Sequence, residues 1–325
     1  MSRVVCSADL FPEHFERLER AGHTVDRTPA GDTQALTAAA GSADAVICLL
    51  TDRIGAELLE RSEHLRIVAN VAVGYENIDL TAAQQRNIVV TNTPDVLTEA
   101  TADHTFALLL ATARHVASAD ASVRDGTFAP WRLHQPFLGS AVYGRTLGIV
   151  GPGRIGAAVA RRGRRGFDMP LLIHSRTAKP NLERELGAKR VPFETLLAES
   201  DVVSVHVPLT PATRHLFDAA AFARMKPSAI LINVARGPVV DEDALVEALE
   251  AGAIAGAGLD VFEREPTVHP GLIRCRNAVL TPHLGSATVD TRRAMADIAV
   301  DNVLAVLAGE APKTPVTESS RADSG

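Results

Sequence analysis

Short apolar runs alternate along the chain with longer segments in which apolar residues recur at the spacing of an amphipathic helix. Uninterrupted runs of Val, Ile, Leu and Ala are typical of strands that are buried on both faces of a parallel sheet. Strands that alternate with helical segments indicate βαβ units joined by right-handed crossovers. The predicted strands cover residues 4–6, 45–50, 65–69, 88–91, 147–150, 171–174, 202–207, 229–233, 255–259 and 278–280.

The pattern changes near residue 97, which suggests a division of the chain. Residues 97–115 form a long apolar helix without Gly or Pro, and a looser stretch follows over 126–144. A second βαβ series begins at Thr146, and the last helix, 289–307, precedes a polar tail over 310–325 that we expect to be mobile.

We therefore predict an α/β fold of two doubly wound Rossmann-like domains with a cleft between them. Residues 1–98 and 286–325 would form the substrate domain, and residues 99–285 the dinucleotide-binding domain. At 325 residues, the chain has the length of about two domains.

The composition, net charge and cysteine content limit which classes of protein the chain can belong to. With 46% hydrophobic and 22% charged residues the chain is globular, and a net charge of −6 argues against nucleic acid as a partner. Cys6, Cys48 and Cys275 are far apart, which favours neither disulfides nor a metal site. Free thiols, no signal-peptide pattern and no membrane-length apolar run predict a cytoplasmic protein without membrane contact.

A glycine-rich turn follows the strand at 147–150. Gly151, Gly153 and Gly156 form the dinucleotide fingerprint in its required place, between a strand and a helix. The first glycine makes the tight turn, the second lets the backbone approach a pyrophosphate, and the third lets helix and strand pack closely.

The end of the next strand indicates which dinucleotide is bound. An NAD site usually has Asp or Glu there to hold the ribose 2′-hydroxyl. This chain has Ser175, Arg176 and Thr177 instead, with Lys179 nearby. Arginine can bond a 2′-phosphate through two parallel hydrogen bonds, so we favour NADP(H) while NAD(H) stays possible.

Three further polar segments follow predicted strands. They contain Arg236, then Asp260 and Glu265, then His283. Ligands of open α/β sheets bind beyond the carboxyl ends of the strands, so these side chains can converge there. An Arg, a Glu and a His would supply an anion clamp and an acid–base pair.

These motifs resemble the D-2-hydroxyacid dehydrogenase family, most of all its glyoxylate/hydroxypyruvate/2-ketogluconate reductases. The spacing of Arg236, Glu265 and His283 fits that family's Arg–Glu–His triad. The resemblance extends over about residues 68–302. It is carried by NVAVGYENID (70–79), TNTPDVLTEATAD (91–103), YGRTLGIVGPGRIG (143–156), GFDMPLLIHSRT (166–177), NVARGPVVDE (233–242), GAGLDVFEREP (256–266) and TPHLGSAT (281–288).

The resemblance implies a role for each catalytic residue. Arg236 would bind the carboxylate and carbonyl oxygen of a 2-ketoacid. His283 would donate the proton in reduction, and Glu265 would stabilise the protonated imidazole. An adjacent carboxylate favours imidazolium, which suits a histidine acid near neutral pH.

The resemblance also implies binding positions, and no metal. Substrate contacts would come from Leu50, Val73, Gly74, Trp131, Arg236 and His283. Cofactor contacts would come from Thr101, Gly151, Gly153, Arg154, Ile155, Gly156, Ser175, Arg176, Thr177, Val234, Ala235, Asp260 and Gly285.

Two alternatives stay open. Trp131 either packs in a core or interface, or reaches the substrate pocket of a partner subunit in a homodimer formed by the helix 97–115 and the following arm. The whole chain is expected to be an NADPH-preferring reductase, with a nicotinamide-binding regulatory protein of corepressor type as the alternative.

Overall fold

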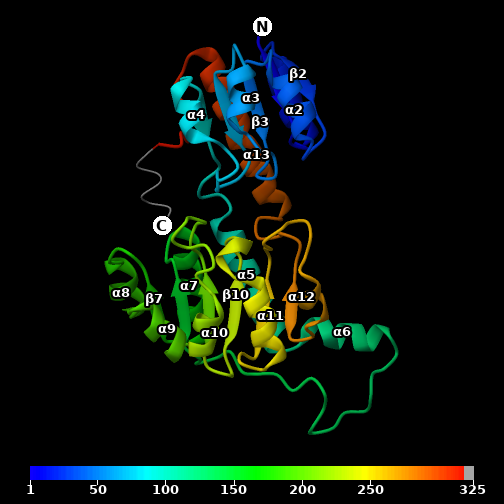
Figure 1. The fold of residues 1–325 in the computed structure, drawn as a ribbon, viewed down its shortest axis with the longest axis vertical. Helices are drawn as coiled ribbons and strands as arrows, with labels where there is room; N and C mark the ends of the chain where they lie inside the picture. Colours follow the sequence, from blue (N-terminus) through cyan, green and yellow to red (C-terminus); the bar gives the residue numbers. More distant parts are fainter. Residues whose placement is uncertain (318–325) are drawn as a thin grey trace. The chain divides into compact units, whose positions relative to one another are not determined.

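A computed structural model of the chain describes residues 1–317. The chain divides into two compact units (Figure 1). One unit comprises Met1–Leu97 and the described residues from Thr288 onward, and the other comprises Thr98–Ala287. Each unit has a parallel sheet flanked by helices, which confirms the predicted α/β class.

The first unit contains a five-stranded parallel sheet in the order β2-β1-β3-β4-β5. Its strands are β1 (Arg3–Cys6), β2 (Thr24–Arg27), β3 (Ala45–Cys48), β4 (Ile67–Asn70) and β5 (Val89–Thr91). Buried residues of α2 (Thr33–Ala40), α3 (Ala56–Arg61) and α4 (Leu80–Gln85) form one core with the sheet. The helices α1 (Pro12–Arg20) and α13 (Val289–Ala308) pack against each other, and α13 also packs against β3 and β4.

The second unit contains a seven-stranded parallel sheet in the order β12-β11-β10-β9-β6-β7-β8. Its strands are β6 (Leu147–Val150), β7 (Leu171–His174), β8 (Lys189–Arg190), β9 (Val202–Val205), β10 (Ile230–Asn233), β11 (Gly256–Leu259) and β12 (Ala278–Leu280). The chain order reverses between β6 and β9, which is the point where open α/β sheets bind ligands.

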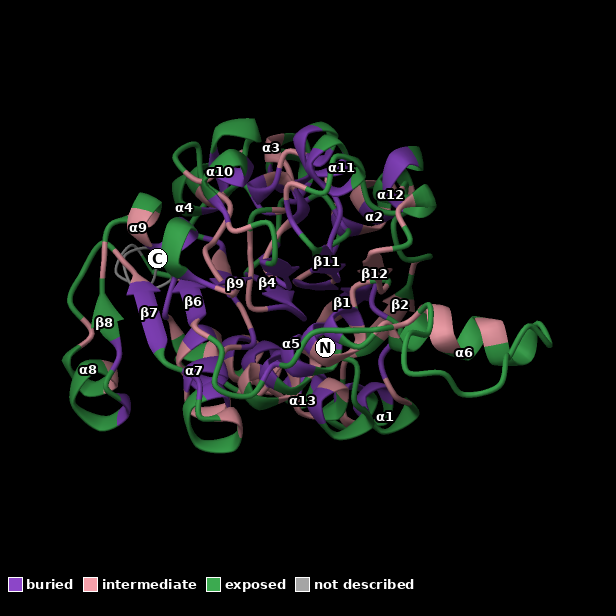
Figure 2. Cartoon of the chain, turned by 90° about the horizontal axis from the view of Figure 1, so that it is seen from below, coloured by how far each residue is buried: buried purple, intermediate pink, exposed green. Residues whose placement is uncertain are grey.

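Helices bury both faces of this second sheet (Figure 2). Residues of α5 (Thr98–Ala113), α7 (Arg154–Phe167) and α8 (Pro180–Leu186) form one core cluster. Residues of α9 (Phe193–Glu199), α10 (Ala219–Arg224), α11 (Glu242–Glu250) and α12 (Pro270–Arg274) form the other. A short 3-10 helix, Gly237–Val239, follows β10.

The expected helix over 97–115 corresponds to α5, and a second helix that the sequence did not predict follows it. α5 ends at Ala113, His115 adopts a left-handed conformation with φ 53°, and α6 (Val116–Arg124) begins after it. Most apolar positions of α5 are buried inside the second unit, and the predicted homodimer contact of this helix stays a prediction. α6 and the segment after it extend outward from this unit and are largely exposed (Figures 1 and 2).

Part of the tail that we expected to be mobile is ordered. The amide of Val316 donates to Val90 of β5 at 2.8 Å, and Asn302 of α13 bonds Lys313 and Thr314. The rest of the predicted tail, 318–325, lies outside the described residues.

Candidate active site

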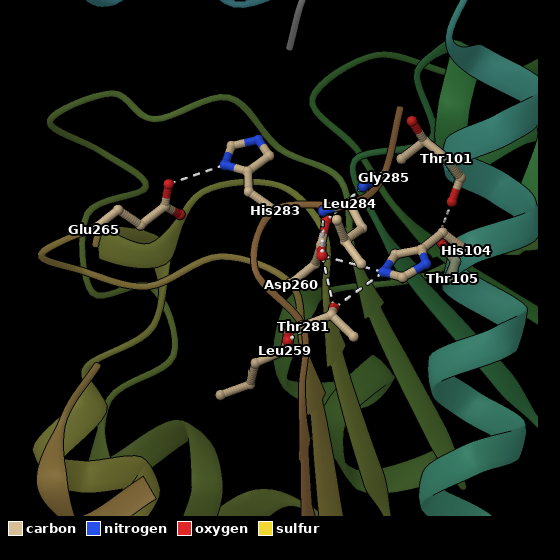
Figure 3. Close-up of polar contacts among 10 residues, drawn as sticks. All are labelled: Thr101, His104, Thr105, Leu259, Asp260, Glu265, Thr281, His283, Leu284 and Gly285. Atoms are coloured by element: carbon tan, nitrogen blue, oxygen red, sulfur yellow. Dashed lines mark hydrogen bonds and ion pairs between the residues drawn. The ribbon is translucent and has the colours of Figure 1, made fainter. Parts of the chain in front are cut away.

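Glu265 and His283 lie within hydrogen-bond distance of each other beyond the carboxyl ends of β11 and β12 (Figure 3). Nδ1 of His283 lies 2.9 Å from Oε2 of Glu265, and Oε1 of Glu265 accepts the amide of Phe262 at 3.0 Å. Burial by itself would raise the pKa of Glu265. The hydrogen bonds with His283 and Phe262 and the positive charge of Arg236 outweigh it, so the pKa lies below its usual value.

A buried asparagine holds the turn that carries Arg236 after β10. The side-chain amide of Asn233 donates to the carbonyl of Arg236 and accepts the amide of Ala235, both at 3.0 Å. Gly237 comes next, where a Cβ would lie 1.9 Å from the carbonyl carbon of Phe262. Glycine is therefore required at 237, and the close approach brings the arginine turn against the loop that carries the carboxylate.

Asp260 fixes the segment that carries His283 (Figure 3). Its carboxylate, which is 1% exposed, accepts the amides of Leu284 at 2.7 Å and Gly285 at 2.8 Å, and the hydroxyl of Thr281 at 2.6 Å. Its backbone carbonyl accepts the amide of His283 at 2.9 Å. These bonds hold His283 at φ 55°, a conformation that residues other than glycine rarely adopt.

The glycine-rich turn has the geometry that a dinucleotide pyrophosphate needs. Gly151 has φ +86°, and a Cβ on Gly156 would lie 2.7 Å from the Gly151 carbonyl. A Cβ on Gly153 would meet nothing within 4 Å, so open space lies beside the backbone at the start of α7. No side chain caps this fourteen-residue helix, whose first amides and dipole suit an anion.

The loop after β7 carries the residues expected near the ribose. Arg176 and Thr177 are exposed, and the Ser175 hydroxyl donates to the Thr177 carbonyl at 2.6 Å. Arg190 of β8 braces the loop, because its guanidinium donates to the carbonyls of Ser175 at 3.0 and 3.1 Å and of Arg176 at 3.1 Å.

The remaining predicted cofactor positions lie in the same unit. Thr101 is buried on α5 and lies close to Gly285. A Cβ on Gly285 would lie 3.3 Å from the methyl group of Thr101. Val234 is buried and Ala235 is half-buried. Arg154 and Ile155 are the first residues of α7, and Ile155 packs against the core of the second unit. Their contacts with a cofactor stay a prediction.

The predicted substrate residues Leu50, Val73 and Gly74 lie in the first unit, after β3 and β4, and all are half-buried. The side chain of Asn92 donates to the Val73 carbonyl at 2.8 Å, and Asn70 donates to the Gly74 carbonyl at 2.7 Å. Because N–H and C=O point in opposite directions across a trans peptide, the Gly74 amide points away from Asn92.

Trp131 lies in the arm after α6 and is 77% exposed. It therefore does not pack in the core of its own chain. Phe128, Leu133 and Leu138 of the same arm are also exposed. A role of Trp131 at a substrate pocket stays a prediction.

Comparison with known proteins identifies the family. The family model described as "D-isomer specific 2-hydroxyacid dehydrogenase, NAD binding domain" matches residues 106–285, inside the second unit. The chain belongs to the D-isomer specific 2-hydroxyacid dehydrogenase family. It is therefore an oxidoreductase with a dinucleotide-binding domain, as the sequence predicts.

Relatives of this dehydrogenase extend over most of its length. It is 53% identical over 279 residues to the glyoxylate reductase of Pyrococcus furiosus, which covers 85% of this chain and 82% of the relative. The TT0316 protein of Thermus thermophilus superposes with a TM-score of 0.91 at 45% identity, covering 97% and 100% of the two chains. The NADPH-dependent glyoxylate/hydroxypyruvate reductase of Sinorhizobium meliloti has a TM-score of 0.86 at 37% identity, and 98% of each chain is covered.

Several residues that support the dehydrogenase site are absent from the sequence prediction. They are Asn70 and Asn92 in the first unit and His104, Arg190 and Asn233 in the second. Asn70, Asn92 and Asn233 gave a signal, since each lies in a stretch that carries the family resemblance, whereas His104 and Arg190 gave none.

The described part of the dehydrogenase has neither a membrane span nor a metal-ligand cluster. Within residues 1–317, no helix is long and apolar enough to cross a bilayer. Over the same residues, no three His, Cys, Asp or Glu side chains are grouped to hold a metal ion.

Proposed function

We propose that this dehydrogenase reduces small 2-ketoacids to D-2-hydroxyacids, with glyoxylate as the first candidate substrate and NADPH as the preferred reductant. The observation that carries the proposal is the 2.9 Å contact between His283 and Glu265 within the electrostatic influence of Arg236. The names of relatives about half identical to this chain support glyoxylate. Hydroxypyruvate and 2-ketogluconate are the other candidate substrates.

Arg236 and His283 would have different roles in the reaction. When bound, the nicotinamide cofactor supplies a hydride to the carbonyl carbon. Arg236 would hold the carboxylate of the substrate, since a guanidinium matches a carboxylate through two hydrogen bonds. His283 would give its proton to the carbonyl oxygen, so that one hydride and one proton convert the ketone to the alcohol.

The orientation of His283 supports this assignment. Its Nδ1 faces Glu265, so Nε2 would be the nitrogen that meets a substrate. The Glu265 carboxylate stabilises the imidazolium that must be present before proton transfer. Within residues 1–317, no contact gives comparable support to the corepressor-type alternative.

The first unit would serve as the substrate domain and the second as the dinucleotide-binding domain. Asn70 and Asn92 hold the carbonyls of Gly74 and Val73, an arrangement that orients the Gly74 amide for a substrate carboxylate. Leu50 would line the pocket next to it.

The preference for NADPH rests on the loop after β7. Ser175, Arg176 and Thr177 would contact the 2′-phosphate, and no carboxylate stands at the end of the strand to repel it. The name of the Sinorhizobium meliloti neighbour, NADPH-dependent, agrees with this preference.

We further infer a cytoplasmic homodimer. Cys6, Cys48 and Cys275 are free thiols, which suits a reducing compartment. The exposed apolar residues of the arm, with Trp131 among them, would be covered by a second copy.

Steady-state oxidation of NADPH and NADH with glyoxylate, hydroxypyruvate, 2-ketogluconate and pyruvate tests the proposal. We expect the highest kcat/KM with NADPH and one of the first three acids. The variant His283→Ala should lose turnover by at least about a hundred-fold while it still binds NADPH. Unchanged turnover in that variant would exclude His283 as the proton donor.

A further inference from the structure

A histidine other than His283, His104, lies within hydrogen-bond distance of the Asp260 carboxylate (Figure 3). His104 lies on α5 one turn after Thr101, and its side chain is 17% exposed. Its Nε2 lies 3.1 Å from Oδ1 of Asp260 and 3.0 Å from the hydroxyl oxygen of Thr281. This pair is separate from the Glu265–His283 pair and reaches the same loop from the opposite side.

The hydrogen bonds determine where the proton of His104 lies. The Thr281 hydroxyl has one hydrogen, which it donates to Asp260 across the shorter distance of 2.6 Å. Thr281 is therefore an acceptor toward His104, and an ionised Asp260 can only accept. Nε2 of His104 must carry a hydrogen, and His104 is a donor to the carboxylate.

Asp260 transmits this contact to the segment that carries His283. Its Oδ1 accepts from His104, from Thr281 and from the amide of Leu284, whereas Oδ2 accepts from the amide of Gly285. A carboxylate that turned or took up a proton would lose part of this set. The strained backbone of His283 needs these contacts to stay in place.

The charge state of Asp260 depends on the same donors. Its burial alone would raise its pKa. The hydrogen bonds from His104, Thr281 and Leu284 outweigh burial and hold the pKa below its usual value. Without His104, a buried carboxylate would lose one of its strongest partners.

We propose that His104 is a positioning residue, which by donating from Nε2 to Asp260 fixes the carboxylate that holds His283 in place for proton transfer. The inference rests on the proposed role of His283. His104 itself touches neither Glu265 nor His283 in the contacts described above, so its effect passes through Asp260.

Three variants separate this role from a general effect on folding. His104→Leu removes the donor, whereas His104→Gln keeps an N–H at the position of Nε2. Thr105→Val is the matched control, because the Thr105 hydroxyl is buried on the same helix but donates to the carbonyl of Thr101 at 2.8 Å. Each purified variant is assayed for kcat and KM with glyoxylate, and for the Kd of NADPH by fluorescence titration.

We expect His104→Leu to lower kcat by about ten-fold to a hundred-fold, the size of one hydrogen bond to a charged group. The Kd of NADPH should rise much less than kcat falls, because the glycine-rich turn is not changed and only the predicted cofactor contacts at Asp260 and Gly285 would shift. His104→Gln should recover most of kcat, and Thr105→Val should match the wild type. If His104→Leu kept the wild-type kcat, or if its only defect were weaker NADPH binding, the inference would be wrong.

A measurement without turnover keeps the two proposals distinct. In ¹⁵N-labelled protein, the amide protons of Leu284 and Gly285 should resonate at low field, because each donates to a charged carboxylate. They should move to higher field in His104→Leu and stay in place in His104→Gln. If the wild type lacked turnover, the proposed function would fail, but these chemical shifts would still decide whether His104 holds the loop. Unmoved chemical shifts in His104→Leu would overturn the proposed role of His104.

Thr281→Val provides an independent check, since Thr281 donates to the same carboxylate oxygen. If both donors act by fixing Asp260, the effects of His104→Leu and Thr281→Val on kcat should combine to less than their product. Fully multiplicative effects would mean that the two side chains act separately, against the inference.

Discussion

The charge of Glu265 matters more than its shape for the proposed proton transfer. Glu265→Gln keeps an oxygen that can bond Nδ1 of His283 but removes the negative charge. The imidazolium would lose its stabilising partner. We expect kcat for glyoxylate reduction to fall by about a hundred-fold.

Steady-state kinetics with glyoxylate measure this loss of kcat. Glu263→Gln is the matched control, since Glu263 lies in the same loop but pairs with His215, at 2.9 Å, instead of His283. An equal loss of kcat in both variants would assign the effect to the loop and not to the His283 partner. A wild-type kcat in Glu265→Gln would contradict the proposed role of Glu265.

The candidate reactive residues stand out in the sequence, whereas the residues that hold them in the structure do not. Arg236, Glu265 and His283 each follow an apolar strand at a spacing that resembles a known triad. His104 and Arg190 stand in no such pattern, and their partners lie far away in the chain. A side chain whose role is to brace another segment becomes visible only when the fold brings the two together.

At the scale of elements, Arg190 of β8 holds the loop after β7, which would select the cofactor. The Arg190 guanidinium holds two carbonyls of that loop, so Arg190→Ala should let Ser175 and Arg176 move. We expect the KM for NADPH to rise by about ten-fold and the KM for NADH to change little, because NADH has no 2′-phosphate for these residues to bind. Steady-state kinetics with both cofactors measure the ratio.

Two variants control this prediction. Arg190→Lys should be intermediate, since an ammonium lacks the fork that bonds two carbonyls. Arg184→Ala removes a positive charge from the adjacent helix, where Arg184 bonds Asn181 and Glu185, and should leave the ratio unchanged. An equal rise in both KM values for Arg190→Ala would show that the loop serves the whole cofactor and not its phosphate.

Ion pairs join α5 to α7, the helix that follows the glycine-rich turn. Arg162 bonds the carboxylates of Glu99 at 2.7 Å and Asp103 at 2.8 Å. Arg162→Ala should lower the free energy of unfolding by about 1 kcal/mol at neutral pH, the upper range for such pairs. Thermal unfolding measures the change, with the exposed Arg165→Ala of the same helix as control.

The sign of the pH effect follows from Glu99. The hydrogen bond from Arg162 lowers the pKa of Glu99. A carboxyl with a lowered folded pKa contributes stability above its unfolded pKa and loses it as the pH falls through the folded value. The Tm difference between Arg162→Ala and the wild type should therefore shrink in acid. A constant difference would mean that Arg162 stabilises through packing alone.

The elements that the sequence predicts well are the buried ones. The central strands are continuous apolar runs, and their predicted positions overlap the observed strands. β2 and β8 were not predicted because they are edge strands with exposed polar residues, TVDR and KR. The helix α6 was not predicted either, since none of its residues is buried and no apolar face marks it in the sequence.

At the scale of the whole molecule, the two units differ in how the chain builds them. Thr98–Ala287 is one continuous segment with two core clusters of its own. The first unit needs two segments, because α13 packs on β3 and β4 with buried residues such as Met295, Val300 and Val303. The continuous unit should therefore fold alone, whereas residues 1–97 should not.

Fragments test this difference. A chain of residues 98–287 should unfold cooperatively and bind NADPH, since it contains the glycine-rich turn and the loop with Arg176. It should not reduce glyoxylate, because the proposed substrate residues Val73 and Gly74 belong to the other unit. Residues 1–97 should lack a cooperative transition until α13 is joined to them through a linker. Circular dichroism and calorimetric titration give both results, and a folded 1–97 fragment would show that α13 is dispensable for the first core.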